Sequence, residues 1–69
     1  MTDELLLEQK IKESGKSKGY LAEKLGITVQ TLRLKITNHT AFYVHEVDKL
    51  CTELNITKLT EKEKIFYKK

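Results

Sequence analysis

The chain has 69 residues, no tryptophan, no proline and a formal net charge of +3. A chain of this length forms one domain, residues 1–69, and buries about 60% of its unfolded surface, which leaves little room for an enclosed catalytic pocket. A single cysteine excludes an internal disulfide. The short apolar run near the start excludes a signal peptide or membrane span. We therefore expect a non-enzymatic cytoplasmic protein without metal, cofactor or small-molecule ligand.

Positive charge gathers in two parts of the chain. Residues 16–41 carry five basic residues against Glu23 alone, and residues 58–69 carry five lysines against two glutamates. The segments 1–15 and 42–57 are each net acidic. A basic block of this kind suits a surface that faces phosphates, although ordinary solvated lysines give the same composition.

The first predicted helix covers about residues 3–14. Asp3, or the residue before it, serves as the N-cap, and Gly15 ends the helix. Glu8 and Lys12 lie four residues apart, a spacing that favours a surface ion pair on one helix.

The second predicted helix covers about residues 18–25 and begins after a serine cap at Ser17. Ala22 is small enough for another helix to pack closely against it. Gly26 adopts the left-handed backbone conformation that ends a helix at little steric cost.

The third predicted helix covers about residues 29–37, with Thr28 as its N-cap and Asn38 as a left-handed stop. Leu32 and Ile36 turn inward toward the preceding helix. Two short helices joined at a glycine in this way form the helix-turn-helix pattern, whose second helix is shaped to enter a DNA major groove.

Two further helices are expected, at about 44–54 and 61–67. Tyr43 is a poor N-cap for the former, whereas Thr60 and Glu63 have the spacing of a capping box for the latter. The apolar end of the last helix packs either on the core or on a second subunit. The fold class is thus all-α, a compact bundle of four to five short helices with a central helix-turn-helix.

An ordered set of short segments runs through most of the chain: Leu-Ala-Glu-Lys-Leu-Gly-Ile-Thr at 21–28, Gln-Thr-Leu at 30–32, Lys-Ile-Thr-Asn at 35–38, Phe42, Glu-Val at 46–47, Lys-Leu-Cys at 49–51 and Leu-Asn-Ile at 54–56. In this order the segments resemble the lambda-repressor-like (Xre/Cro) helix-turn-helix domains, particularly the short forms encoded by phages of low-GC Gram-positive bacteria. The resemblance spans about residues 5–57.

The resemblance implies that the third helix reads bases through Thr28, Val29, Gln30, Arg33 and Leu34. Gln30 is suited to adenine and Arg33 to guanine, since each side chain can make two hydrogen bonds to that base edge. The apolar Val29 and Leu34 could pack on thymine methyl groups, but core packing or a partner surface explains them equally.

The resemblance also implies a set of phosphate contacts. They come from the start of the second helix, the third helix and the loop that follows it: Ser17, Lys18, Thr31, Lys35, Thr37, Asn38, His39, Thr40 and Tyr43. Such contacts position a protein on the duplex without reading its sequence.

A metal site is not expected from the cluster His39, His45, Glu46, Asp48 and Cys51. His45 and Cys51 are six residues apart, about 240° around a helix, so they face different directions. Cys51 falls on the apolar stripe of its helix and is predicted to be a buried hydrophobe.

The helix-turn-helix pattern and the basic block predict a protein that binds double-stranded DNA, and the resemblance implies that it is a phage Cro-like repressor. It would occupy a pseudo-palindromic operator as a homodimer and act at the bacterial nucleoid. Two alternatives stay open: a protein-interaction module, such as an antitoxin or anti-repressor, and an excisionase-like protein that bends DNA.

Overall fold

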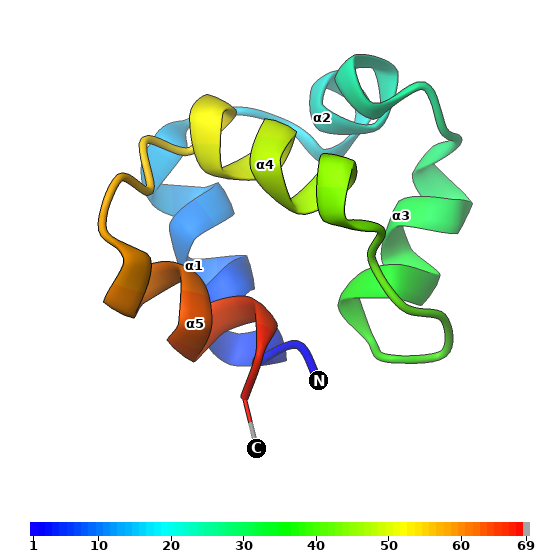
Figure 1. The fold of residues 1–69 in the computed structure, drawn as a ribbon. Coiled ribbons are helices and arrows are strands. Elements are labelled where there is room, and N and C mark those ends of the chain that lie inside the picture. The colour runs from blue at the N-terminus through cyan, green and yellow to red at the C-terminus, as the bar shows by residue number, and fades with distance from the viewer. Residues whose placement is uncertain (69) are drawn as a thin grey trace.

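A computed structural model describes residues 1–68, and these residues fold into five helices without a strand. The helices are α1 (Glu4–Ser14), α2 (Lys18–Leu25), α3 (Val29–Ile36), α4 (Val44–Glu53) and α5 (Leu59–Phe66). In Figure 1, α4 lies across the middle of the molecule, with α1 and α5 on one side and α2 and α3 on the other. The predicted all-α fold class is confirmed.

The first three helices begin at side-chain caps. The side chains of Asp3, Ser17 and Thr28 accept hydrogen bonds from the backbone N–H three residues later, at the starts of α1, α2 and α3. Each cap satisfies one of the backbone donors that the first turn of a helix leaves unpaired. All three caps match the sequence prediction.

Left-handed residues end four of the helices. Gly15 and Gly26 have φ of 74° and 72°, and Asn38 and Asn55 have φ of 66° and 56°. After α2, the Ile27 N–H donates to the Ala22 carbonyl at 3.0 Å, a bond typical of the Schellman motif. Because this turn occupies so few residues, α3 starts immediately beside the end of α2.

The core draws apolar side chains from every helix. Its largest fully buried side chains are each at most 2% exposed: Leu7, Leu21, Leu32, Ile36, Val47, Leu50 and Ile65. Ala22 is 1% exposed, as its predicted place between packed helices requires. Phe42, in the loop before α4, packs edge-on against Phe66 of α5 with the ring centroids 5.6 Å apart.

The last helix differs from its prediction. It runs over Leu59–Phe66 rather than 61–67, Lys58 occupies the N-cap position, and no side-chain cap is made. The expected capping box is therefore wrong. Ile65 and Phe66 are buried in the core, so the position of α5 follows the burial of its apolar end rather than the local Thr-x-x-Glu pattern.

The two ends of the described chain are tied together. The Asp3 N–H donates to the Ile65 carbonyl at 2.6 Å, and the Lys68 N–H donates to the Met1 carbonyl at 2.8 Å. Figure 1 shows the two ends close to each other below α1 and α5. Residues 1–3 are thus part of the fold.

Candidate functional site

The outer face of α3 is the candidate site. Gln30 and Arg33 are exposed, whereas Leu32 and Ile36 on the opposite face are 0% and 1% exposed. Among residues 1–68, Arg33 forms no ion pair. The helix is therefore fixed by its buried face and presents an unpaired guanidinium and an amide to solvent.

The first turn of α3 is held by two hydroxyl groups. The Thr28 side chain accepts from the Thr31 N–H at 3.1 Å, and the two threonine hydroxyls lie 2.9 Å apart in a hydrogen bond. Thr28 is exposed and Thr31 is half-buried. Both hydroxyls thus lie at the N-terminal end of α3, next to the face that carries Gln30.

The two apolar residues predicted to meet bases differ in their surroundings. Val29 is half-buried and packs against the core, which accounts for its apolar side chain without any ligand. Leu34 is 39% exposed. The core therefore explains Val29 fully, and Leu34 is the apolar residue of α3 that still requires an explanation.

The first backbone donors after α3, up to Thr40, are already in use. The N–H groups of His39 and Thr40 both donate to the Leu34 carbonyl, at 2.9 and 3.3 Å. The Thr37 hydroxyl donates to the Arg33 carbonyl and lies 2.9 Å from His39 Nδ1. His39 and Thr40 can therefore offer an anion the imidazole ring and the hydroxyl group, which are exposed, rather than their backbone N–H groups.

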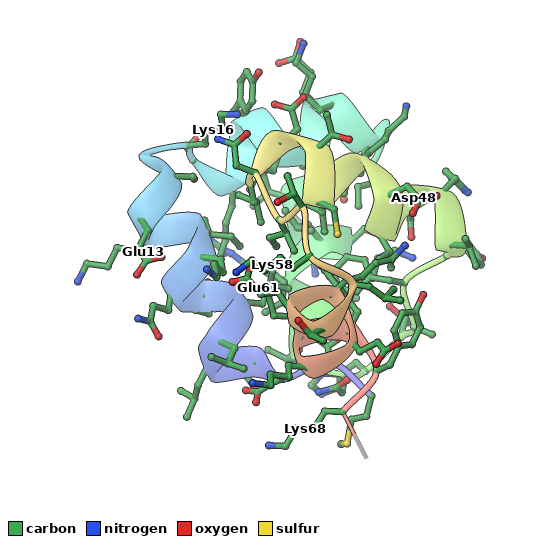
Figure 2. The ribbon with its side chains drawn as sticks, turned by 60° about the vertical axis from the view of Figure 1, so that its left-hand side comes forward. Glu13, Lys16, Asp48, Lys58, Glu61 and Lys68 are labelled. Atoms are coloured by element: carbon green, nitrogen blue, oxygen red, sulfur yellow. The ribbon has the colours of Figure 1, made fainter. Side chains whose placement is uncertain are left out.

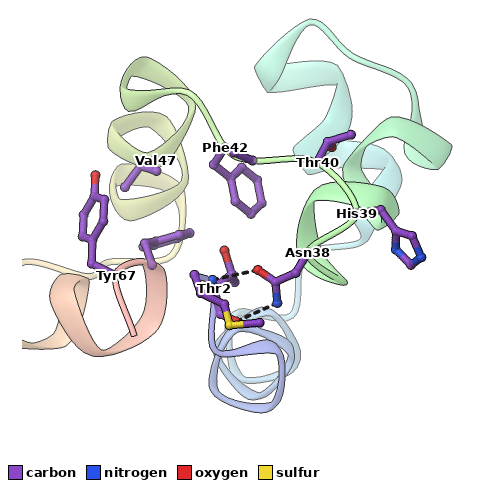
Figure 3. A pocket seen from close by; sticks show the side chains of 10 residues that line it. Thr2, Asn38, His39, Thr40, Phe42, Val47 and Tyr67 are labelled. Atoms are coloured by element: carbon purple, nitrogen blue, oxygen red, sulfur yellow. Dashed lines mark hydrogen bonds between the residues drawn. The ribbon is translucent and has the colours of Figure 1, made fainter. Parts of the chain in front are cut away.

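The Asn38 side chain binds the N-terminal segment. Its Oδ1 accepts from the Thr2 N–H, and its Nδ2 donates to the Thr2 carbonyl, both at 2.9 Å. Figure 3 shows this pair at the wall of an open depression of about 440 Å³, with Phe42 beside it and His39 turned away. Asn38 was predicted to contact phosphate, but its side-chain amide already makes these two hydrogen bonds, called here the clamp, with the Thr2 backbone.

Lys35 corrects the sequence prediction most clearly. It was predicted to contact phosphate, yet it is 5% exposed, and its Nζ lies 2.9 Å from Glu46 Oε1. The same ammonium donates to the Ala41 carbonyl at 3.0 Å and lies 4.4 Å from the centroid of the Tyr43 ring. Because these groups surround it on the inner side of the loop, Lys35 joins α3 to α4 and is not available to a ligand.

Glu46 completes this buried pair and starts α4. Its Oε1 accepts from the Tyr43 N–H at 2.8 Å, so the carboxylate supplies the cap that the Tyr43 side chain does not. Burial raises the pKa of Glu46, but the Tyr43 N–H and the Lys35 ammonium together outweigh it and hold the pKa below its ordinary value. Tyr43 itself is 64% exposed.

The start of α2 lies beside α3, since Lys18 lines one groove together with Arg33 and Thr37. Ser17 is exposed and its hydroxyl oxygen accepts from the Tyr20 N–H at 3.0 Å. Lys18 Nζ lies 2.9 Å from Glu8 Oε1 of α1. Glu8 therefore pairs across two helices rather than with Lys12 as its spacing along α1 indicated.

Most of the predicted basic block is neutralised by neighbours. Lys16 binds Glu53 at 3.2 Å, and its ammonium and that of Lys24 lie 5.6 and 5.4 Å from the centroid of the Tyr20 ring. Together with the pairs of Lys18 and Lys35, this leaves Arg33 and Lys24 as the residues of the block without an ion pair in the described chain.

Other kinds of site have little support in the described residues. No three His, Cys, Asp or Glu side chains of residues 1–68 gather as metal ligands would. Cys51 is buried, as predicted, and burial raises the pKa of its thiol. None of the helices between residues 1 and 68 is long and apolar enough to cross a membrane.

Two parts of the site were not predicted from the sequence. These are the ion pair of Glu8 with Lys18 and the buried ion pair of Glu46 with Lys35, and each joins residues at least ten positions apart. Spacing along one helix does not reveal such pairs.

A scan of family models, a search of curated proteins and a search of solved structures found no match to this chain.

Proposed function

We propose that this protein is a sequence-specific DNA-binding regulator that places α3 in the major groove of duplex DNA. The observation that supports the proposal is the outer face of α3, where Gln30 and Arg33 are exposed side by side along one helix whose other face is buried. An α-helix fits the major groove, and these two side chain types are suited to base edges there.

The contacts that hold α3 in place support this role. A base contact discriminates only if the protein holds the side chain in a fixed position, and α3 is capped by Thr28, buried through Leu32 and tied to α4 by Lys35. In the proposed complex Arg33 forks onto guanine, Gln30 pairs with adenine and Leu34 packs on a thymine methyl group.

Phosphate contacts would come from accessible residues around α3. Lys18, at the start of α2, lines a groove together with Arg33 and Thr37, Ser17 directly precedes it, and His39 and Thr40 follow the C-terminal end of α3. Thr31, Thr37 and Tyr43 are secondary candidates, since each is at least partly accessible. Lys35 and Asn38 are removed from the set, because buried and intramolecular contacts occupy their side chains.

A homodimer on a pseudo-palindromic operator is the proposed assembly. The molecule measures 27 × 24 × 21 Å between its Cα extremes. Half-sites on one face of the duplex lie about 34 Å apart, a separation at which two such molecules sit side by side with room for side chains between them. Occupying a promoter in this way would block polymerase, so we propose repression.

The first experiment selects binding sites from a random pool of duplex oligonucleotides. Recovery of a pseudo-palindromic sequence with half-sites one helical turn apart is expected. Equal affinity for every sequence, or no binding at low salt, contradicts the proposal. Capture of a stoichiometric protein from nuclease-treated host lysate instead would favour an interaction module, and strong bending of the selected site would favour an architectural role.

The second experiment tests α3 itself. Arg33→Ala is expected to weaken binding to the selected site by about 1–3 kcal/mol and to relax preference at one base pair. Lys64→Ala is the matched control, because it removes one exposed positive charge from α5, away from α3. Gel-shift titrations against the site and its single-base variants measure both effects. If Arg33→Ala and Lys64→Ala behave alike, α3 is not the reading helix.

A further inference from the structure

An open groove runs where α1, the start of α2 and the C-terminal half of α3 meet. It has a volume of about 340 Å³ and is lined by Glu8, Lys18, Arg33, Ile36 and Thr37. The lining thus includes two cationic side chains, one hydroxyl and one carboxylate. In the proposed complex this groove borders the reading face of α3, so it faces the sugar-phosphate backbone.

Glu8 already pairs with one of the two cations of this groove. Lys18 Nζ lies 2.9 Å from Glu8 Oε1, and the two side chains are 31% and 42% exposed. A pair that is this accessible is held weakly, because water and salt screen it. A phosphate can therefore displace the carboxylate.

We propose that Glu8 competes with DNA phosphate for Lys18 and thereby sets the strength and salt dependence of DNA binding. In the free protein Glu8 holds the Lys18 ammonium, and on DNA a phosphate oxygen takes its place. The inference rests on the proposed function and deepens it, since it assigns a regulating carboxylate to the same site.

Counter-ions give the exchange a measurable signature. A lysine that neutralises a phosphate releases a condensed cation, and each such contact adds about 0.9 to the slope of log affinity against log salt. Here the same step uncovers Glu8 near the duplex, and the bare carboxylate attracts a cation in return. The two effects oppose each other, so Lys18 contributes little to the slope while Glu8 is present.

Base preference is not affected by this exchange. Lys18 would meet phosphate in specific and non-specific complexes alike, and Glu8 therefore weakens both by the same factor. This distinguishes Glu8 from Arg33, whose contact with a base edge would change preference.

The test compares wild type, Glu8→Gln, Lys18→Gln and the double variant Glu8→Gln with Lys18→Gln on the selected operator. Fluorescence anisotropy from about 50 to 200 mM salt gives the affinity and its slope for each protein. Glu8→Gln is expected to bind about threefold tighter or more at the lowest salt, with a slope steeper by about 0.9. Lys18→Gln is expected to reduce the slope by about 0.9 in the Glu8→Gln background and by less than half as much in wild type.

Glu61→Gln is the matched control for net charge. It also removes one carboxylate from a surface pair, since Glu61 lies 2.9 Å from Lys10, but this pair joins α1 to α5. Figure 2 shows Glu61 on α5, beside Lys58. The control is expected to keep the wild-type slope. Thermal unfolding followed by circular dichroism establishes that each variant is folded.

The possible outcomes separate the two proposals. Equal slope changes for Lys18→Gln in both backgrounds, or identical behaviour of Glu8→Gln and Glu61→Gln, overturn the competition while wild-type binding upholds the proposed function. Failure of wild type and Glu8→Gln to bind any duplex at low salt overturns the proposed function and this inference with it.

Discussion

Lys35 lies on the helix proposed to read DNA, yet its side chain serves the interior. The ammonium has three partners: the Glu46 carboxylate, the Ala41 carbonyl and the Tyr43 ring. An ion taken out of water is stable only when its charge and hydrogen bonds are satisfied in this way. The pair therefore fixes the distance between the end of α3 and the start of α4.

Removing one member of this pair is expected to be far worse than removing both. Lys35→Ala should lower the free energy of unfolding by about 3–5 kcal/mol, because it leaves the Glu46 carboxylate buried without a counter-charge. Lys35→Met combined with Glu46→Leu should recover most of that loss, since it buries two apolar side chains of similar size. Urea unfolding of both variants measures the difference. Equal losses in the two proteins would show that the pair is not electrostatically coupled.

Asn38 combines two roles that substitution can separate. Its backbone is left-handed, with φ of 66°, and its amide binds both backbone groups of Thr2. Asn38→Gly keeps the backbone conformation and loses the clamp, whereas Asn38→Ala loses both.

The alanine variant is expected to be less stable than the glycine variant by about 1 kcal/mol, which is the cost of the left-handed conformation for a residue with a Cβ. Both variants should lose hydrogen-exchange protection at the Thr2 amide, whose acceptor they remove. Retained protection at Thr2 in either variant would show that the clamp does not form in solution.

Residues whose hydrogen bonds or backbone conformation are local could be predicted from the sequence, whereas residues whose partners are distant along the chain could not. Ser17 and Thr28 were identified as caps because a cap bonds to a backbone N–H three residues away, and Asn38 was identified as a left-handed stop for the same local reason. The family resemblance implied that Lys35 contacts phosphate, whereas its partner in the structure, Glu46, lies on another helix and is reached only through the fold.

The packing of α2 against α3 depends on one small side chain. Ala22 is 1% exposed, and the turn that follows it brings the start of α3 close to α2. Ala22→Leu is expected to lower the free energy of unfolding by about 1–3 kcal/mol or more, because added methyl groups have no space between the helices. Ala22→Gly is a useful comparison, since it tests propensity without overpacking. An unchanged melting temperature for Ala22→Leu would contradict this packing.

The ends of the helices show how local and tertiary preferences compete. α2 matches its predicted bounds, with a serine cap before it and a glycine after it. α5 begins two residues earlier than predicted, and its position follows Ile65 and Phe66 in the core. A short isolated helix is marginal in water, so tertiary burial outweighs a capping box in fixing such an element.

On the scale of the whole molecule, one core supports every feature of the candidate site. The apolar periodicity along the chain was enough to predict the helical class, and it placed Gln30 and Arg33 on the outer face of α3. It could not predict which basic residues stay accessible. Ion pairs occupy Lys16, Lys18 and Lys35 in the fold, so the positive surface is smaller than the composition indicated.

Stability at low pH should depend on Glu46 more than on the surface carboxylates. The pKa of Glu46 lies below its ordinary value of 4.5, so the folded state binds its proton less readily than the unfolded state does. Its contribution to the free energy of unfolding is therefore complete above about pH 4.5 and is lost as the pH falls through the lower pKa of the folded state.

The difference in unfolding free energy between wild type and Glu46→Gln is accordingly expected to be largest near pH 7 and to shrink below pH 4.5. Protonation makes the wild-type side chain neutral, as glutamine already is, while the Tyr43 N–H keeps an acceptor in both proteins.

Glu61→Gln serves as the control. A hydrogen bond from Lys10 lowers the pKa of Glu61, but this pair is on the surface, where solvent screening leaves little for pH to change. Urea titrations at a series of pH values measure these differences. A gap between wild type and Glu46→Gln that stays constant from pH 7 to pH 3 would mean that the charge of Glu46 does not stabilise the junction of α3 and α4.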